Sequence, residues 1–307
     1  MSDSYAIATR DFKSILDFLR FGLTRAYAEP LHYGHGTDNA WDDIFALVLG
    51  CLSLPHDVDQ MFLTAQLTPD EKTILAGLLE RRIVHRVPVP YLTHEAYFCE
   101  MLFYVDERVL IPRSPIAELI NQQFSPWVSV PDVSRILDLC TGGGCIAIAC
   151  CHAFPMAQVD AADISPDALA VAEINRQQHG VQEQLTLIES DCFDAVPSVK
   201  YDIIVSNPPY VGRNEMQTLP DEYRHEPTLA LETGQNGLEI VERILRTSGR
   251  YLTPEGILVV EVGNSEDALV DAYPHVPFTW LEFEHGGHGV FLLTTEQVNE
   301  YFSVETH

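Results

Sequence analysis

The sequence predicts an α/β protein: a doubly wound parallel sheet with a C-terminal antiparallel hairpin, preceded by a small all-α N-terminal domain and a β-hairpin linker. Three observations predict this fold. Apolar residues recur at helical spacing up to about residue 90, strand and helix patterns alternate from about residue 133 onward, and the last apolar segment alternates around a Gly-Gly turn. We therefore expect a helical domain at residues 1–92, a linker at 93–112 and a larger domain at 113–307.

Three segments of the N-terminal domain show helix patterns. Segment 11–28 carries apolar residues on one helical face, and segment 39–54 continues the same spacing. Segment 68–86 opens with Thr68 as a predicted N-cap and Pro69 at the first helical position. The linker follows, where aromatic and β-branched residues flank Asp106-Glu107 and predict a hairpin that turns there.

Strands and helices alternate through the larger domain. One predicted helix shows its boundaries most clearly, with Ser165 as its cap and Gly180 after its end. Parallel strands joined by helices bind ligands beyond their carboxyl ends, so this edge is where we expect the site. Strands are predicted at 135–140, 157–164, 185–190, 201–206 and 256–263, helices at 144–154, 165–180 and 236–252, and the antiparallel hairpin at 278–295.

The composition limits the classes of partner. Eighteen basic residues face 45 acidic ones, for a net charge of −27. Such a surface repels phosphate backbones and steers a basic partner, so we expect no direct DNA binding. No apolar run approaches the roughly 20 residues needed to span a bilayer, the N-terminus is charged and amphipathic, and the seven cysteines show no C-x-x-C spacing. We therefore expect a cytoplasmic protein with reduced thiols, outside any membrane; its oligomeric state is left open.

A glycine loop follows the first strand of the larger domain and opens a helix. Gly142, Gly143 and Gly144 permit positive φ and let a ligand approach the backbone closely. Asp163 ends the second strand, where a carboxylate can accept both hydroxyls of a ribose, and Asp191 follows the third, where it can meet an adenine amino group. This predicts a nucleoside-bearing cofactor. NAD remains a rival, because the loop also satisfies the dinucleotide fingerprint.

The fourth strand ends in Asn207-Pro208-Pro209-Tyr210 at the same sheet edge. Prolines fix φ and cannot donate, so the Asn207 side-chain oxygen and the Pro208 carbonyl form a rigid pair of acceptors for the two hydrogens of an –NH2 group. Tyr210 is expected to pack its ring on the planar group that carries this nitrogen.

These motifs, in this order, resemble those of the class I S-adenosylmethionine-dependent methyltransferases that alkylate amide or exocyclic amino nitrogens. The chain most closely resembles the HemK-type protein-glutamine methyltransferases, which have a helical N-terminal domain, a hairpin linker and a catalytic domain. The segments 222–227 and 259–291 are most similar to the branch that modifies large-subunit ribosomal protein number three; a sister branch modifies peptide release factors. Other matching segments lie at 86–92, 110–120 and 219–245.

The resemblance implies S-adenosylmethionine as cofactor, a Rossmann-like class I methyltransferase fold and a basic ribosomal protein as substrate. It implies that the helical domain selects the substrate. Asn207, Pro208 and Tyr210 are the implied catalytic residues, and Pro209 joins them in binding the substrate. Cys140 departs from the family pattern, which usually has glycine there. The implied cofactor-binding residues are Asp138, Cys140, Thr141, Gly142, Gly143, Gly144, Asp163, Asp191 and Asn207.

Three rival functions remain open at this point: adenine amino methylation of nucleic acid, a non-enzymatic binding module and an NAD-linked oxidoreductase. The acidic charge argues against the first and the intact Asn-Pro-Pro-Tyr loop against the second. Arg113 is expected at a hinge, at the cofactor edge or at an ordinary domain interface, and Phe103 and Tyr104 in the substrate cleft or in the hairpin core. We expect no metal site, because the cysteines at 140, 145, 150 and 151 span a loop and a helix and cannot converge.

Overall fold

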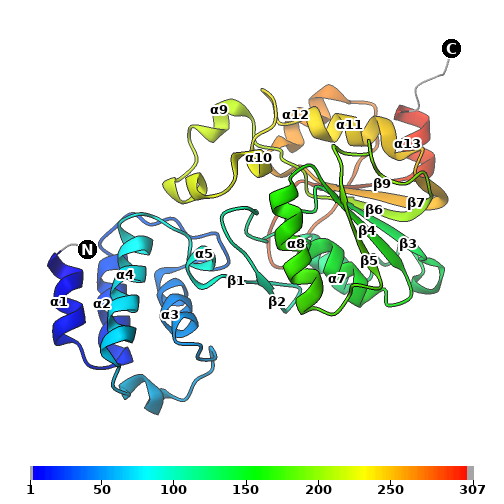
Figure 1. Ribbon diagram of the computed structural model, residues 1–307. Coiled ribbons are helices and arrows are strands. Elements are labelled where there is room, and N and C mark those ends of the chain that lie inside the picture. The colour runs from blue at the N-terminus through cyan, green and yellow to red at the C-terminus, as the bar shows by residue number, and fades with distance from the viewer. Residues whose placement is uncertain (1–2, 303–307) are drawn as a thin grey trace. The chain divides into compact units, whose positions relative to one another are not determined.

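Residues 3–302 are described by the computed structural model, and they divide into two units (Figure 1). The smaller, helical unit contains the chain up to Ala96 together with 105–107 and 220–225. The larger unit contains 97–104, 108–219 and the chain from Glu226 onward. Segment 220–225 therefore belongs to the helical unit although it lies far along the chain, which no local sequence pattern indicates.

The helical unit contains α1 (Asp3–Asp11), α2 (Ile15–Ala26), α3 (Ala40–Cys51), η1 (Gln60–Thr64), α4 (Pro69–Ile83), α5 (Val89–Thr93) and η3 (Asp221–His225). The prediction of one helix across 11–28 is wrong. Ser14 interrupts it by capping α2 in a capping box with Asp17, a local competition that apolar spacing does not reveal. Thr68 caps α4 as predicted and forms a capping box with Glu71.

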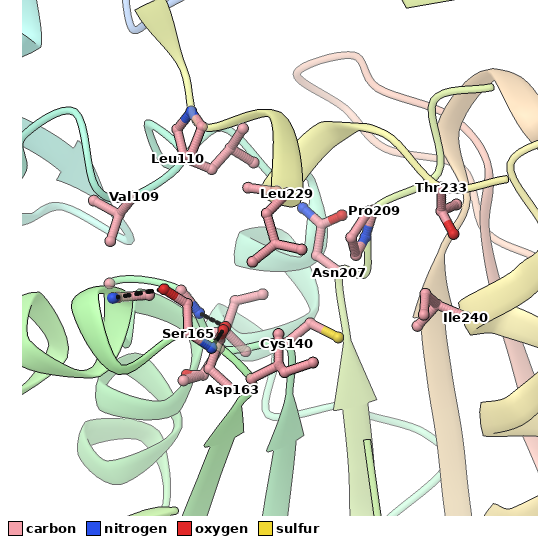
Figure 2. A pocket seen from close by; sticks show the side chains of 18 of the residues that line it. Val109, Leu110, Cys140, Asp163, Ser165, Asn207, Pro209, Leu229, Thr233 and Ile240 are labelled. Carbon is pink, nitrogen blue, oxygen red and sulfur yellow. Dashed lines mark hydrogen bonds between the residues drawn. The ribbon is translucent and has the colours of Figure 1, made fainter. Parts of the chain in front are cut away.

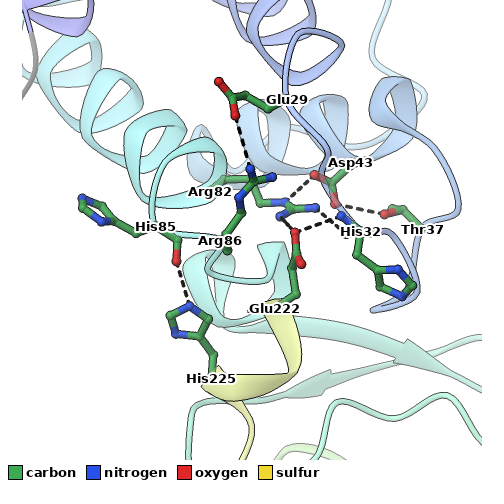
Figure 3. Close-up of polar contacts among 9 residues, drawn as sticks. All are labelled: Glu29, His32, Thr37, Asp43, Arg82, His85, Arg86, Glu222 and His225. Atoms are coloured by element: carbon green, nitrogen blue, oxygen red, sulfur yellow. Dashed lines mark hydrogen bonds and ion pairs between the residues drawn. The ribbon is translucent and has the colours of Figure 1, made fainter. Parts of the chain in front are cut away.

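A buried ion cluster holds segment 220–225 in the helical unit (Figure 3). The Arg82 guanidinium, with only 2% of its side chain exposed, contacts Asp43 through Nε at 2.6 Å and Glu222 through Nη1 at 3.3 Å. Its Nη2 donates to the His32 carbonyl at 3.0 Å, and the His32 amide donates to Glu222 at 2.9 Å. One arginine thus satisfies two buried carboxylates from distant parts of the chain.

Arg82→Ala is expected to destabilise the helical unit by about 3–5 kcal/mol, because it leaves two buried carboxylates without their shared cation. Urea unfolding followed by a probe in the helical unit measures the change. Arg224→Ala is the matched control in the same segment. Arg224 pairs with Asp221 while both side chains are largely exposed, so its removal should cost less than about 1 kcal/mol. Equal effects of the two substitutions would contradict this account.

The hairpin turns at a different place from the predicted one. Strands β1 (Glu95–Phe98) and β2 (Met101–Tyr104) form a two-stranded sheet and are joined through Cys99 and Glu100. The two turn residues have φ values of 47° and 61°, which two-residue hairpin turns require and which Asn or Gly usually supplies. Since neither residue type is present at these two positions, no local signal predicts a turn here. Asp106, placed in the turn by the sequence, is buried instead.

The larger unit is built on a seven-stranded sheet of order β5-β4-β3-β6-β7-β9-β8. Strands β3 to β7 are parallel, and β9 pairs antiparallel with both β7 and β8, which confirms the doubly wound sheet and its antiparallel C-terminal end. The strands are β3 (Arg135–Leu139), β4 (Gln158–Asp163), β5 (Leu185–Glu189), β6 (Tyr201–Ser206), β7 (Leu252–Glu261), β8 (Thr279–Trp280) and β9 (Val290–Thr294).

Helices cover the sheet and build a hydrophobic core on each side of it. One core joins α6 and α7 to the sheet, and the other joins α11, α12 and α13 to it. The helices are α6 (Ile116–Asn121), α7 (Cys145–Ala153), α8 (Pro166–Gln178), α9 (Arg213–Met216), α10 (Thr228–Leu231), α11 (Glu239–Ser248), α12 (Glu266–Ala272) and α13 (Thr295–Phe302), with short 3-10 turns η2 (Val130–Asp132) and η4 (Gly263–Ser265). Across residues 3–302, no helix has the length and apolar character needed to cross a membrane.

Candidate active site

The glycine loop leaves β3 and enters α7 through several residues with positive φ. Gly142 and Gly144 have φ values of 55° and 80°, and a Cβ on Gly144 would lie 3.2 Å from the Ala172 side chain. Cys140 also has a positive φ, 57°, a conformation that favours glycine. A glycine could adopt this conformation without the strain that the Cys140 side chain adds.

Asp138 lies beneath this loop, fully buried. One carboxylate oxygen accepts hydrogen bonds from the Thr141 hydroxyl at 2.5 Å and the Ala147 amide at 3.1 Å, while the other has no partner among the described residues. Burial raises the pKa of Asp138 to about 7. Unlike Thr141, Asp138 does not line the cavity described below, so it supports the loop from behind.

Asp138→Asn is expected to flatten the pH dependence of stability between about pH 4 and pH 7. The native pKa of about 7 lies above the ordinary value of 3.8, so within this interval the native state keeps a proton that the unfolded chain has lost. Stability of the wild type therefore falls as pH rises, by at most about 1.4 kcal/mol per pH unit for this group. Urea titrations of both proteins at several pH values measure the difference; parallel curves would contradict the assignment.

Asp163 joins the end of β4 to the glycine loop. Its Oδ2 accepts from the Gly142 amide at 2.8 Å and its Oδ1 from the Ser165 amide at 2.9 Å. Burial raises the pKa of Asp163, and the backbone hydrogen bonds act in the opposite direction. The carboxylate lines the cavity beside Cys140 and Ser165 (Figure 2), and its two backbone hydrogen bonds hold it there.

Asn175 is a structural residue of the site that sequence reasoning missed. This fully buried side chain of α8 donates to the Gly143 carbonyl at 2.8 Å and to the Tyr104 carbonyl at 3.1 Å, and it accepts from the Tyr104 amide at 2.8 Å. It thereby ties the glycine loop to the end of β2. A polar residue on the same helical face as Ala168 and Val171 was the signal available in the sequence.

Asp191 also lines the cavity, and it pairs with a second residue that the sequence did not indicate. Arg243 of α11 donates to Asp191 Oδ1 at 2.7 Å, and Asp191 remains partly exposed. Phe103 is fully buried, and neither it nor Tyr104 lines the cavity. Arg113 does line the cavity and makes a two-point ion pair with the buried Glu226, at 2.6 and 2.8 Å.

Only part of the Asn-Pro-Pro-Tyr loop lines the cavity. Asn207 and Pro209 line the cavity (Figure 2), whereas Pro208 is buried. Tyr210 is outside the cavity lining; its hydroxyl donates to Glu261 at 3.1 Å and its carbonyl accepts from Ser265 at 2.8 Å. The structure thus brings Asn207 to the glycine loop and anchors Tyr210 against the end of β7.

The cavity itself has a volume of about 440 Å3, within the range of small-molecule sites. The glycine loop, two aspartates and Asn207 face it from four strand ends, and apolar side chains such as Leu229 and Ile240 close it. This combination suits a cofactor with a hydroxyl-bearing sugar, a flat base and an apolar portion. Within residues 3–302, no group of three or more histidine, cysteine or acidic residues is arranged to hold a metal ion.

The fold and this cavity at the carboxyl ends of its strands define a class I methyltransferase. A family model described as the methyltransferase small domain matches residues 122–221, and the cofactor of this class is S-adenosylmethionine, as the sequence predicted. A solved structure described as a human methyltransferase 10 domain-containing protein is 17% identical, with 63% of this chain and 88% of that chain covered and a TM-score of 0.46.

Two relatives narrow the class to one family. The ribosomal protein uL3 glutamine methyltransferase of Francisella tularensis is 45% identical over 289 residues, 94% of this chain and 92% of its own length. That of Neisseria meningitidis serogroup B is 47% identical over 292 residues, 95% of this chain and 96% of its own length. The chain belongs to the family of ribosomal protein uL3 glutamine methyltransferases, which confirms the predicted family and its branch.

Proposed function

We propose that the protein transfers the methyl group of S-adenosylmethionine to the side-chain amide nitrogen of a glutamine in ribosomal protein uL3. The observation that carries this proposal is the place of Asn207, which faces the same cavity as the glycine loop and Asp163. An amide-binding group therefore lies beside the expected cofactor. The full-length similarity to uL3 glutamine methyltransferases supports glutamine over an adenine amino group.

The chemistry depends on orientation. An amide nitrogen is a poor nucleophile because its lone pair is delocalised into the carbonyl. When bound, S-adenosylmethionine supplies an electrophilic methyl group on a sulfonium. The Asn207 side-chain oxygen and the Pro208 carbonyl accept the two N–H hydrogens and so aim the lone pair, an alignment that supplies several of the roughly 7–11 kcal/mol available from orientation. The methylated nitrogen is strongly acidic, so its proton leaves to water without a dedicated base.

The remaining residues hold the cofactor and the loop. Asp163 binds the ribose hydroxyls, Asp191 with its partner Arg243 borders the base, and the amides of the glycine loop approach the cofactor closely. Asp138 and Thr141 keep that loop in place through their hydrogen bond. Tyr210 positions the loop that carries Asn207 and does not act as a base.

Charge and chain organisation support a basic protein partner. Proteins that bind ribosomal RNA are rich in Lys and Arg, and the net charge of −27 attracts such a substrate. We assign its selection to the helical N-terminal domain, with residues 93–112 as linker and 113–307 as catalytic domain, and we place the reaction in the cytoplasm, where ribosomal proteins are made.

Mass spectrometry of intact ribosomal proteins from cells lacking this gene tests the proposal. We expect uL3 to lose the mass of one methylene group and every other ribosomal protein to keep its mass. Unchanged uL3, together with loss of the same mass from a peptide release factor, would move the protein to the sister activity.

A further inference from the structure

Glu261 is a buried carboxylate that the mechanism above does not use. It ends β7, and because Ser206 pairs with Val260 in the parallel register, Glu261 lies beside the start of the Asn-Pro-Pro-Tyr loop. Only 5% of its surface is exposed. A carboxylate at this depth is costly unless it has partners, so its contacts indicate what it does.

Two hydroxyl groups converge on this carboxylate. The Tyr210 hydroxyl donates to Oε1 at 3.1 Å, and the Ser114 hydroxyl donates to Oε2 at 2.5 Å. Burial raises the pKa of Glu261, whereas the two hydrogen bonds and the nearby charges of Arg113 and His288 lower it. The two donors meet different oxygens of the carboxylate, whereas a glutamine side chain in the same place would have an acceptor oxygen at only one of the two positions and an NH2 donor at the other.

From these contacts we propose that Glu261 is a positioning residue for methyl transfer, acting through Tyr210 to hold Asn207 and Pro208 in the orientation that the acceptor amide requires. The inference rests on the function proposed above and adds a residue to it.

The contacts around Tyr210 explain how its hydroxyl can help to hold the Asn-Pro-Pro-Tyr loop in place. Its ring lies against Gly263, where a Cβ would come within 2.6 Å of the ring carbon Cε2. Its carbonyl is held by the Ser265 hydroxyl at 2.8 Å, and Gly237 leaves room for that carbonyl with a φ of 77°. The ring, carbonyl and hydroxyl of Tyr210 are all held in place. Because the two prolines between Tyr210 and Asn207 have fixed φ angles, holding Tyr210 also restricts the backbone conformation at Asn207.

The second oxygen of Glu261, Oε2, contacts another segment of the cavity lining through Ser114. The Ser114 hydroxyl that donates to Glu261 also accepts from the Ile116 amide at 3.2 Å, at the start of α6. Its neighbour Arg113 is paired with Glu226, which also accepts from the Ile111 amide at 3.1 Å. One carboxylate thus links the acceptor loop to segment 111–116, and Arg113 of that segment lines the cavity.

The test compares Glu261→Gln, Tyr210→Phe and the double variant with the wild type. We expect Glu261→Gln to lower kcat about 10- to 100-fold with the Kd of S-adenosylmethionine changed less than about threefold. Because both substitutions break the same contact, the double variant should be no slower than the slower single variant. Fully additive losses, or a kcat of Glu261→Gln within threefold of wild type, would overturn the inference.

A matched control separates positioning from general destabilisation. Tyr201 donates to the buried Asp160 at 2.7 Å in another tyrosine–carboxylate pair, at the opposite end of the strands from Asn207. Asp160→Asn should lower the unfolding midpoint and leave kcat within twofold of wild type. A drop in kcat equal to that of Glu261→Gln would show that any buried pair has this effect, which contradicts a positioning role.

Hydrogen exchange gives a readout that does not depend on the substrate. Glu261→Gln and Tyr210→Phe should each speed exchange of the amides of Asn207, Tyr210 and Val211 by a similar factor, and Asp160→Asn should not. Unchanged exchange in the first two variants would overturn the inference. Failure of the wild-type enzyme to methylate uL3 would contradict the proposed function instead. Hydrogen exchange would still test whether Glu261 holds the Asn-Pro-Pro-Tyr loop in place, because that measurement needs no substrate.

Discussion

Asn207→Ala is expected to lower kcat for glutamine methylation about a thousandfold while changing the Kd of S-adenosylmethionine less than about threefold. The asparagine oxygen is one of two acceptors proposed to orient the amide of the substrate. Without it, the amide can rotate away from the reactive orientation, which lowers kcat. The cofactor keeps its contacts with the glycine loop and Asp163. Steady-state kinetics gives kcat, and calorimetry gives the Kd.

Asn264→Ala is the matched control for this substitution. Asn264 is an exposed asparagine in the turn after β7, where it contacts Glu215 and His288 and does not line the cavity. Its removal should leave kcat within twofold of wild type. If Asn207→Ala keeps more than about a tenth of wild-type kcat, the acceptor role assigned to Asn207 is wrong.

Asp163→Ala is expected to have the converse effect and weaken S-adenosylmethionine binding by at least about 100-fold, which corresponds to about 2.7 kcal/mol. The substitution removes the carboxylate assigned to the ribose hydroxyls. It also leaves the Gly142 and Ser165 amides without the acceptor that holds them at 2.8 and 2.9 Å. Saturating cofactor should restore much of kcat, because the acceptor loop is untouched.

Asp167→Ala serves as the control for the cofactor effect. Asp167 lies in the first turn of α8, exposed and away from the cavity lining, yet only four positions from Asp163. Calorimetry should find its cofactor affinity within about twofold of wild type. An unchanged Kd in Asp163→Ala would place the ribose contact on another residue.

The fold could be predicted because its signals are local. Strands β3, β4 and β6 are short runs that are buried along most of their length, and the glycine loop and the cap at Ser165 mark where the chain leaves a strand or starts a helix. Predictions were wrong where apolar spacing or the usual turn residues did not reveal the interaction that decides the structure. Ser14 stops a helix within an apolar pattern that continues past it, and Cys99-Glu100 turns a hairpin without Asn or Gly.

The residues of the candidate site also fall into two groups: those that chain order predicts and those that depend on contacts between distant parts of the chain. Asn207, Asp163 and the glycines follow directly after strands, so chain order alone brings them to one sheet edge. Asn175, Arg243 and Glu261 act through contacts with residues far away in the sequence. A single sequence holds no record of those pairings, and residue type alone does not distinguish a buried carboxylate from an exposed one.

Methyl transfer to a glutamine of uL3 is tested by incubating the purified protein with uL3 and methyl-labelled S-adenosylmethionine and locating the label by tandem mass spectrometry. We expect one labelled methyl on the side-chain amide nitrogen of a single glutamine of uL3, and none when Asn207→Ala replaces the wild type for the same short incubation. Label on another residue type, on a release factor or on RNA with uL3 unlabelled would contradict it.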